Sequence, residues 1–268
     1  GLPLMGIGDL NDGMNRVGVQ GKGESVWGGM LLLLVLAEFI PLCELCGDTK
    51  GALRYAKEMR GMEASSESDA WNGAWYRRAW YDDGTPMGDA GDPEAEIDVL
   101  PQAFAAILHS RVRLPGGGRP FSADRVQSAM RAAYERLFDP EASTFALLAP
   151  AFGGGSDSAH DPGYIAAYPP GIRENGGQYT HAAVWGAMGL FAADMPGEGM
   201  EVLHALSPLK TLTDTDAASR YQKEPWALCG DVLRARGRVG EGGWSLYTGS
   251  AGWYYRLLWE VFGDGENR

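Results

Sequence analysis

The run of residues 24–45 limits the possible folds more than any other part of this sequence. Nearly every position in it is apolar, on all sides of the helix that the run predicts, and Gly47 ends it. A helix that is apolar all round belongs in the middle of a packed array. Glu38 and Pro41 interrupt the run, and its most apolar part, 30–42, is shorter than the ~20 residues that cross a membrane. We therefore expect a buried core helix.

The rest of the pattern predicts more helices, joined by loops that carry Gly, Trp, Asp and Asn. Apolar positions recur at helical spacing in eight further segments: 49–64, 97–108, 122–137, 181–192, 199–206, 214–221, 226–236 and 250–262. Strand signals are few, with one short pair expected within 68–91, and no fixed repeat is present. The fold class is therefore all-α, with long functional loops and a few short strands, in a single domain over residues 1–268.

Charge and cysteine spacing argue against two kinds of partner. The chain has 35 acidic and 23 basic side chains, a net charge of −12, and no basic patch, so nucleic acid is a poor partner. Cys43 and Cys46 have redox or half-zinc spacing, but no second pair completes a zinc site, and we interpret them as core cysteines.

Acidic and amide side chains also gather near the N-terminus without making a metal site. Asp9, Asn11, Asp12 and Asn15 lack the glutamate that closes a calcium loop. We expect them to form a hydrogen-bond network that orders a loop, at the rim of a site. No metal and no organic cofactor are expected.

Residues 173–181 are the most informative polar segment. They read Arg-Glu-Asn-Gly-Gly-Gln-Tyr-Thr-His and follow a Pro-Pro-Gly turn. Two adjacent glycines let the backbone approach a ligand closely, and the flanking charged and amide groups can bind hydroxyls or anions. The segment predicts one wall of a polar substrate site, with Arg173, Glu174 and Gln178 as ligand-binding side chains. Glu174 could instead simply pair with Arg173.

Seven sequence islands, in a fixed order over nearly the whole chain, together carry a family resemblance. They are Gly-Asp-Leu-Asn-Asp-Gly-Met-Asn at 8–15, Gly-Glu-Ser-Val-Trp at 23–27, Trp-Asn-Gly-Ala-Trp-Tyr-Arg-Arg-Ala at 71–79, Asp-Asp-Gly at 82–84, Asp-Pro-Gly-Tyr-Ile at 161–165, Tyr-Pro-Pro-Gly-Ile at 168–172 leading into 173–181, and Tyr-Thr-Gly-Ser-Ala-Gly-Trp at 247–253. The chain resembles the glycoside phosphorylase family of cellobiose and chitobiose phosphorylases (glycoside hydrolase family 94, formerly glycosyltransferase family 36). Its closest resemblance is to the C-terminal domain of cyclic β-1,2-glucan synthases.

The resemblance implies a partial (α/α)6 toroid, with a sugar-binding pit at one end of the ring. The chain would hold the C-terminal part of this catalytic domain, and the N-terminal β-domain and first helices would lie upstream. An incomplete ring exposes apolar helix faces. The resemblance also implies a cytoplasmic location, or the soluble domain of a membrane-bound synthase. Upstream domains of the same enzyme, or a second copy, would be its protein partners.

The implied reaction is phosphorolysis with inversion, in which inorganic phosphate is the co-substrate and one general acid suffices. In the family that acid is an Asp in a Trp-Asp-Gly-x-Trp motif, and this chain has Asn72 at that position. Asn cannot release a proton at working pH. Three interpretations stay open: a weakened or dead catalyst, rescue by Asp82, Asp83 or Glu174, or binding without turnover.

The resemblance places phosphate at His181, Thr248 and Gly249, and an imidazole, a hydroxyl and a backbone N–H at a helix start suit an anion. Each residue could instead have a purely structural role, His181 as a core histidine and Thr248 and Gly249 as part of an ordinary helix cap. Trp71 would be a stacking platform for the sugar, or a core aromatic. This interpretation requires Asn72 to face His181 and Thr248 across a space the size of a pyranose ring.

Two functions therefore remain. The first is a glycoside phosphorylase-type glycosyltransferase (a hexosyltransferase) that cleaves β-linked glucan, above all β-1,2-glucan, to a sugar 1-phosphate, with activity impaired by Asn72. The second is a non-catalytic carbohydrate-binding remnant of such an enzyme. A plain helical interaction module is a third possibility, which the polar Gly-rich loops argue against.

Overall fold

The computed structural model describes residues 1–9, 11–153, 160–246 and 249–263. Its helices are α1 (Val26–Leu45), α2 (Thr49–Ser68), α3 (Val99–Arg111), α4 (Ala123–Leu137), α5 (Thr180–Ala192), α6 (Pro196–Leu206), α7 (Thr215–Tyr221) and α8 (Ser250–Phe262), with 3₁₀ turns η1 (Asp12–Met14), η2 (Tyr164–Ala167) and η3 (Pro208–Leu212). The all-α prediction is confirmed, and seven of the eight further helical segments form helices.

The strands are all two residues long and pair antiparallel. They are β1 (Glu24–Ser25), β2 (Ala79–Trp80), β3 (Pro86–Met87), β4 (Ile97–Asp98), β5 (Phe138–Asp139), β6 (Thr144–Phe145), β7 (Leu148–Ala149), β8 (Gln178–Tyr179) and β9 (Asp231–Val232). The first three form one sheet, and the others pair as β4–β7, β5–β6 and β8–β9. The strand pair expected within 68–91 is therefore present as β2 and β3.

The helix predicted over 226–236 is wrong. Instead, β9 lies in that segment and pairs with β8, with Asp231 opposite Tyr179. The Gly230 N–H donates to the Trp244 carbonyl, and the Gly243 N–H donates to the Asp231 carbonyl. These long-range hydrogen bonds satisfy backbone groups that a helix would pair locally, and Gly230 itself weakens a helix.

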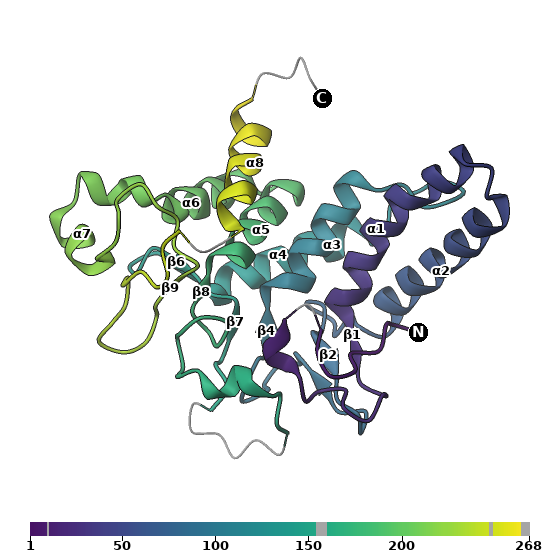
Figure 1. Ribbon diagram of the computed structural model, residues 1–268, viewed down its shortest axis with the longest axis horizontal. Coiled ribbons are helices and arrows are strands. Elements are labelled where there is room, and N and C mark those ends of the chain that lie inside the picture. Colours follow the sequence, from purple (N-terminus) through teal and green to yellow (C-terminus); the bar gives the residue numbers. More distant parts are fainter. Residues whose placement is uncertain (10, 154–159, 247–248, 264–268) are drawn as a thin grey trace.

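The helices form two layers. Neighbouring helices α1, α3, α5 and α8 contact one another in that order, and α2, α4 and α6 each pair with the helix before them (Figure 1). This is the arrangement expected for part of an (α/α)6 toroid. Strands β1, β4 and β8 directly precede α1, α3 and α5, so the loops gather where these helices begin.

Small residues bring the central helices close together. Residues 99–108 of α3 are all buried, and α5 is buried along most of its length. A Cβ added to Gly189 of α5 would lie 2.8 Å from the Ala103 Cα of α3, closer than real side chains come. This close contact fixes how α5 sits beside α3, and therefore where the start of α5 projects.

The helix predicted at 24–45 is only partly buried. One side of α1 packs into the core through residues such as Trp27, Met30 and Leu33, but Phe39 and Leu42 are about half exposed. By length and composition alone α1 could cross a membrane, a test that core helices of soluble proteins also pass. Partial exposure of an apolar helix is what an incomplete ring predicts.

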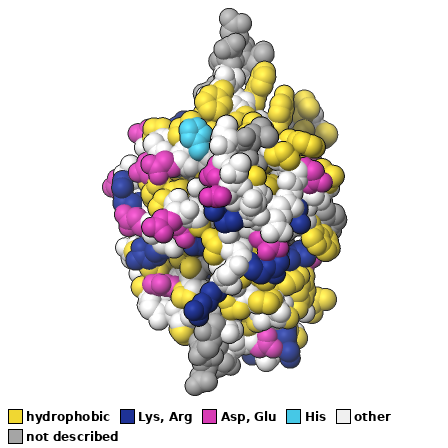
Figure 2. All heavy atoms as spheres, turned by 90° about the vertical axis from the view of Figure 1, so that its left-hand side faces the viewer, with side chains coloured by type: hydrophobic (Ala, Val, Ile, Leu, Met, Phe, Trp, Pro, Cys, Tyr) yellow, Lys and Arg dark blue, Asp and Glu magenta, His cyan; other side chains and the backbone are white. Residues whose placement is uncertain are grey.

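Exposed apolar side chains also lie on α8. On the face shown in Figure 2, hydrophobic side chains gather toward the top, the level at which α8 lies in Figure 1. Tyr255, Trp259 and Phe262 are each more than half exposed. The two ends of the helical arc, α1 and α8, thus both present apolar surface.

A buried charge cluster ties the loop end together. The Arg78 side chain is fully buried, and its guanidinium donates to Asp9 Oδ2 at 2.9 Å and to Asp98 Oδ2 at 3.1 Å. Burial raises the pKa of Asp98 to about 6, although the Arg78 guanidinium acts to lower it. Two acidic side chains therefore share one buried guanidinium.

The partners of Arg78 are also helix caps. Asp98 Oδ1 accepts the Leu100 N–H at the start of α3, and Ser25 Oγ accepts the Gly28 N–H at the start of α1. Ser25 also donates to Asp9. One arginine thus links the first loop to the starts of two central helices.

Replacing Arg78 with Met should lower the free energy of unfolding by about 3–5 kcal/mol, because it leaves two carboxylates buried without a cation. Chemical denaturation followed by tryptophan fluorescence measures this. Arg77→Met is the matched control: Arg77 pairs with Asp89 at a partly exposed site, and its loss should cost about 1 kcal/mol or less. Equal losses for the two variants would contradict a central role for Arg78.

Candidate active site

Two adjoining cavities open among the loops that precede the central helices. The first, of about 220 Å³, is the carboxylate cavity, with Asn11, Asp12, Trp27, Tyr164, Glu174 and Trp185 among its lining residues. The second, of about 330 Å³, is the histidine cavity, with His181, Gly230, Asp231, Trp244 and Gly249 among its lining residues. Arg173 and Tyr179 line both cavities. A ligand that spans this shared wall would contact both sets of residues.

The carboxylate cavity is named for Asp12, which stands at its rim. Asp9 accepts the Asn11 N–H, Asn11 Oδ1 accepts the Gly13 N–H at 3.1 Å, and Asn15 Oδ1 accepts the Tyr164 N–H at 3.1 Å, so three of the four residues expected in a hydrogen-bond network take part in one. Asp12 is exposed and, among the described residues, its carboxylate forms no ion pair or hydrogen bond. Partial burial and then the negative charge of Asp12 raise the pKa of Tyr164.

The shared wall is built around Arg173. Its guanidinium lies 5.1 Å from the ring centre of Tyr168 and 5.5 Å from that of Trp244. It pairs with Glu174 at 3.3 Å, so the Arg173–Glu174 pairing considered from the sequence is present. Asp231 Oδ2 accepts the Arg173 N–H at 3.1 Å. These contacts hold the Arg173 guanidinium between the two cavities, where Glu174 partly neutralises its charge.

His181 gives the second cavity its character. Its ring packs 4.2 Å from Trp185, centre to centre, and burial lowers its pKa, which favours the neutral imidazole at pH 7. His181 Nε2 is buried and has no hydrogen-bond partner among the described residues. A Cβ on Gly249, at the start of α8, would lie 3.5 Å from the ring, so Gly249 and His181 are neighbours as predicted. Thr248 lies outside the described residues.

Comparison with known proteins decides the family. Residues 1–262 match the family described as "Glycosyl hydrolase 94 superfamily, catalytic domain". The chain belongs to this superfamily. The resemblance recognised in the sequence islands is confirmed.

Individual relatives agree with the family. The chain is 39% identical over 256 residues to the cyclic beta-(1,2)-glucan synthase NdvB of Rhizobium meliloti (strain 1021), and this match covers 96% of the present chain and 9% of NdvB. It is 32% identical over 263 residues to the 3-O-beta-D-glucopyranosyl-beta-D-glucuronide phosphorylase of Paenibacillus borealis, and this match covers 97% of the present chain and 31% of the phosphorylase. It is 27% identical over 250 residues to the N,N'-diacetylchitobiose phosphorylase of Vibrio furnissii, covering 92% and 28%. The chain thus spans less than a third of each of these relatives.

Buried polar atoms without hydrogen-bond partners gather around the carboxylate cavity in this part of the glycosyl hydrolase 94 domain. Nine buried side-chain atoms lack a hydrogen-bond partner in the described residues, and four of them belong to the lining of the carboxylate cavity: Asn11 Nδ2, Trp27 Nε1, Trp185 Nε1 and Glu174 Oε2. Of these four atoms, Glu174 Oε2 takes part in the ion pair with Arg173. Each such atom costs about 1–3 kcal/mol. Three donors and one acceptor around one cavity suit a ligand rich in hydroxyl groups.

The predicted site residue Asn72 lies elsewhere. Asn72 Oδ1 accepts the N–H groups of Ala74 at 3.0 Å and Trp75 at 2.9 Å, and Nδ2 donates to the Gly88 carbonyl at 3.2 Å. Asn72 lines neither of the two cavities, so the structure does not bring it together with His181 there. Its assignment as the general-acid position stays a prediction.

Two other predicted ligand-binding residues also lie away from the two cavities. Trp71 packs edge-on against Tyr76, with the Arg125 guanidinium 5.1 Å from its ring centre. Gln178 is buried, and its Oε1 accepts the Phe145 N–H at 2.9 Å. Both make structural contacts here, and sugar binding by either residue stays a prediction. Arg173, Glu174, His181 and Gly249 do come together.

Sequence reasoning missed several lining residues. Asp12 was expected at the rim of a site but was given no chemical role, and Trp244 was within reach, since it follows a Gly-Gly pair. Asp231 had no local signal, because it lies in the segment predicted as helix. It meets Arg173 only because β9 pairs with β8.

Stability should fall in acid partly because of His181. Burial holds the pKa of folded His181 below the unfolded value of about 6.5, so the unfolded state binds its proton first as the pH drops. The free energy of unfolding should therefore fall as the pH drops below about 6.5, and less steeply in His181→Asn. Denaturant titrations across this range measure the slope. His204→Asn, at an exposed histidine on α6, is the control and should leave the slope unchanged. An unchanged slope in His181→Asn would contradict the prediction.

Proposed function

We propose that this domain catalyses inverting phosphorolysis of β-linked glucan to a sugar 1-phosphate. The observation that carries the proposal is the pairing of two cavities across one wall, with the Asp12 carboxylate, unpaired among the described residues, on one side and the half-buried His181 imidazole on the other. Relatives named as phosphorylases, and a cyclic glucan synthase at 39% identity, support the reaction type. The identity to NdvB favours β-1,2-glucan as the substrate.

Inverting phosphorolysis needs a proton donor on one side of the sugar and phosphate on the other. A phosphate oxygen forms a bond to the anomeric carbon, the glycosidic C–O bond breaks, and the acid gives its proton to the leaving oxygen. We assign phosphate to the histidine cavity, held by His181, by the Gly249 backbone at the start of α8, and by Thr248 as the sequence predicts. Inorganic phosphate is the co-substrate, with no other cofactor.

Asp12 is the proton donor that the cavity geometry favours. It lines the carboxylate cavity and has no ion-pair partner among the described residues, whereas Glu174 is paired with Arg173. Asn72, which the family resemblance assigns to this role, carries no transferable proton and bonds to its own turn. A proton donor at Asp12 removes the reason to expect impaired activity from Asn72.

Sugar hydroxyl groups would form hydrogen bonds with the atoms of the carboxylate cavity that lack a hydrogen-bond partner among the described residues. The indole N–H groups of Trp27 and Trp185 and the Asn11 amide can donate to hydroxyl oxygens, and Glu174 can accept. Their rings add apolar surface for a sugar face. Upstream domains or a second copy remain proposed partners. The proposed location is cytoplasmic, alone or as the soluble domain of a membrane-bound synthase.

The alternative function is carbohydrate binding without turnover. One observation favours it: Asn stands at position 72, where the family resemblance places the acid. The two functions differ in which substitution changes the chemistry.

Asp12→Asn in the intact protein should lower kcat by about 10²–10⁴-fold and leave KM for the glucan nearly unchanged, because a general acid acts in the transition state. Phosphate-dependent release of glucose 1-phosphate from β-1,2-glucooligosaccharides measures this. Asn72→Asp is the matched control. It should change activity little and should lower stability, because an ionised carboxylate would face the Gly88 carbonyl.

Opposite outcomes separate the alternatives. Full activity in Asp12→Asn, or a gain of orders of magnitude in Asn72→Asp, would place the acid at position 72. Binding of the oligosaccharide without turnover in the natural chain and in both variants would establish the carbohydrate-binding alternative.

A further inference from the structure

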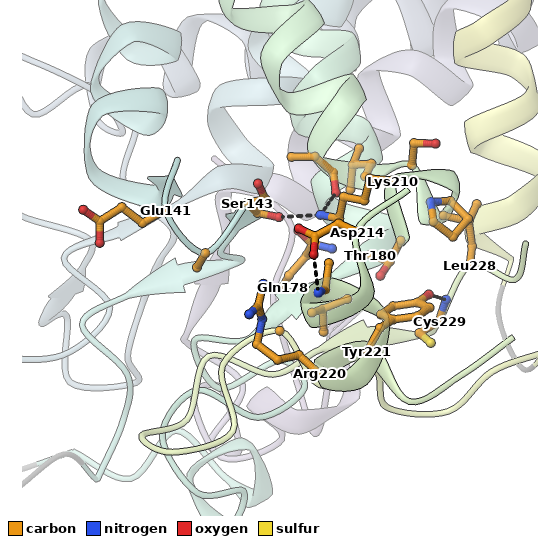
Figure 3. A pocket seen from close by; sticks show the side chains of 18 residues that line it. Glu141, Ser143, Gln178, Thr180, Lys210, Asp214, Arg220, Tyr221, Leu228 and Cys229 are labelled. Atoms are coloured by element: carbon orange, nitrogen blue, oxygen red, sulfur yellow. Dashed lines mark hydrogen bonds between the residues drawn. The ribbon is translucent and has the colours of Figure 1, made fainter. Parts of the chain in front are cut away.

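A third cavity, the lysine cavity, lies behind the proposed active site. It has a volume of about 280 Å³ and is bounded by the β5–β6 turn, β8, the end of α6, η3, α7 and the segment around β9 (Figure 3). Its lining shares no residue with either cavity of the proposed site. The volume falls just below the ~300–1,000 Å³ of most ligand pockets, so its ligand would be small.

The strand pair β8–β9 separates the lysine cavity from the histidine cavity. Successive side chains of a strand point to opposite faces. On β8 and the residues that follow it, Gln178 and Thr180 line the lysine cavity, whereas Tyr179 and His181 line the histidine cavity or the shared wall. Around β9, Cys229 and Val232 face the lysine cavity, whereas Gly230 and Asp231 face the other. The two cavities are thus opposite sides of one thin partition.

Lys210 gives the lysine cavity a positive charge. Its Nζ donates to the carbonyls of Ala205 at 2.6 Å and Ser143 at 3.2 Å, and an ammonium has a third N–H to donate (Figure 3). No carboxylate of the described chain forms an ion pair with it. Burial, and then the positive charge of Arg220, lower the pKa of Lys210 to about 8. Within the described residues, this ammonium has carbonyl partners but no counter-ion.

Arg220 is a second cation in the lining. It lies on α7, is exposed, and makes no hydrogen bond or ion pair within the described part of the chain. Of the two carboxylates that also line the cavity, Asp214 caps α7 by accepting the N–H groups of Asp216 and Ala217, and Glu141 is exposed. Neither one forms an ion pair with Lys210, whereas backbone hydrogen bonds and then the nearby charge of Arg220 lower the pKa of Asp214.

A buried hydroxyl completes the cavity. Thr180 is 2% exposed, lines the cavity, and its Oγ1 has no hydrogen-bond partner in the described residues. A hydroxyl left in this state costs about 1–3 kcal/mol unless a ligand or water bonds to it. It is a second, uncharged feature that calls for a polar ligand.

We propose that the lysine cavity binds a small phosphate-bearing ligand, with its phosphate group between Lys210 and Arg220 and a hydrogen bond to Thr180. Neither cation forms an ion pair within the described residues, which favours an anionic ligand, and a guanidinium matches the fork of phosphate oxygens. Inorganic phosphate and a small phosphate monoester share this chemistry. The site is distinct from the phosphate position proposed at His181, and does not depend on the proposed function.

The test measures how fast the Lys210 amine is acetylated with and without phosphate. The intact protein is acetylated at pH 8 with a limiting amine-reactive reagent, and mass spectrometry follows each lysine. Bound phosphate should cover the Lys210 amine and favour its charged form, slowing its modification by about fivefold or more at saturation. Exposed Lys50 on α2 is the internal reference. Chloride at equal ionic strength controls for screening.

Variants assign the protection to one side of the partition. Arg220→Gln should raise the phosphate concentration that gives half-maximal protection of Lys210 by about tenfold. Arg236→Gln, at an exposed arginine in the same region, should leave this concentration unchanged. His181→Ala should leave protection intact. Both arginines are exposed, so these variants should fold, and circular dichroism checks this.

The result that supports the site is protection that Arg220→Gln weakens and His181→Ala does not. Protection at lower concentrations by inorganic phosphate than by glucose 6-phosphate identifies the free ion as the ligand, and the reverse order identifies a monoester. The proposal is overturned if phosphate fails to protect Lys210, if chloride protects equally, if Arg220→Gln changes nothing, or if His181→Ala abolishes protection.

Discussion

The buried guanidinium of Arg78 is the interaction on which the loop end of this domain depends. It joins Asp9 in the first loop to Asp98 at the start of α3, and Ser25 at the start of α1 bonds to the same Asp9. A buried cation is tolerated only when its donors are satisfied, so these three segments must meet in one arrangement. That arrangement places Asn11 and the adjacent Asp12 opposite the loop of Arg173.

The short strand pair β8–β9 has a comparable role on the other side of the site. Its alternating side chains divide polar residues between the proposed active site and the lysine cavity. Because the strands are only two residues long, backbone bonds at their ends fix the division, including Thr180 N–H to the Gly230 carbonyl. A ligand on one side would contact the same backbone that carries His181 and Asp231 on the other.

Most of the helical framework could be predicted from local signals. The apolar spacing of α4 and the end of α1 before Gly47 were predicted from the sequence, and the structure has both. The segment 226–236 was wrongly predicted as a helix because its backbone forms hydrogen bonds with β8, which is distant in the sequence, and with residues 243–244, which follow a glycine turn. Exposure of half of α1 could not be read from composition, because an apolar helix looks the same whether or not a neighbour covers it.

By itself, the sequence determined the family, the helical class and the polar segment 173–181, because these depend on residue order and on contacts within a few positions. Only the tertiary structure decided which polar groups share a cavity. Asp12, Arg173 and Asp231 come from loops far apart in the chain, and they meet because helix packing and strand pairing set where each backbone segment points. The same forces turn Asn72 and Gln178, both plausible ligands in the sequence, toward backbone groups of their own surroundings.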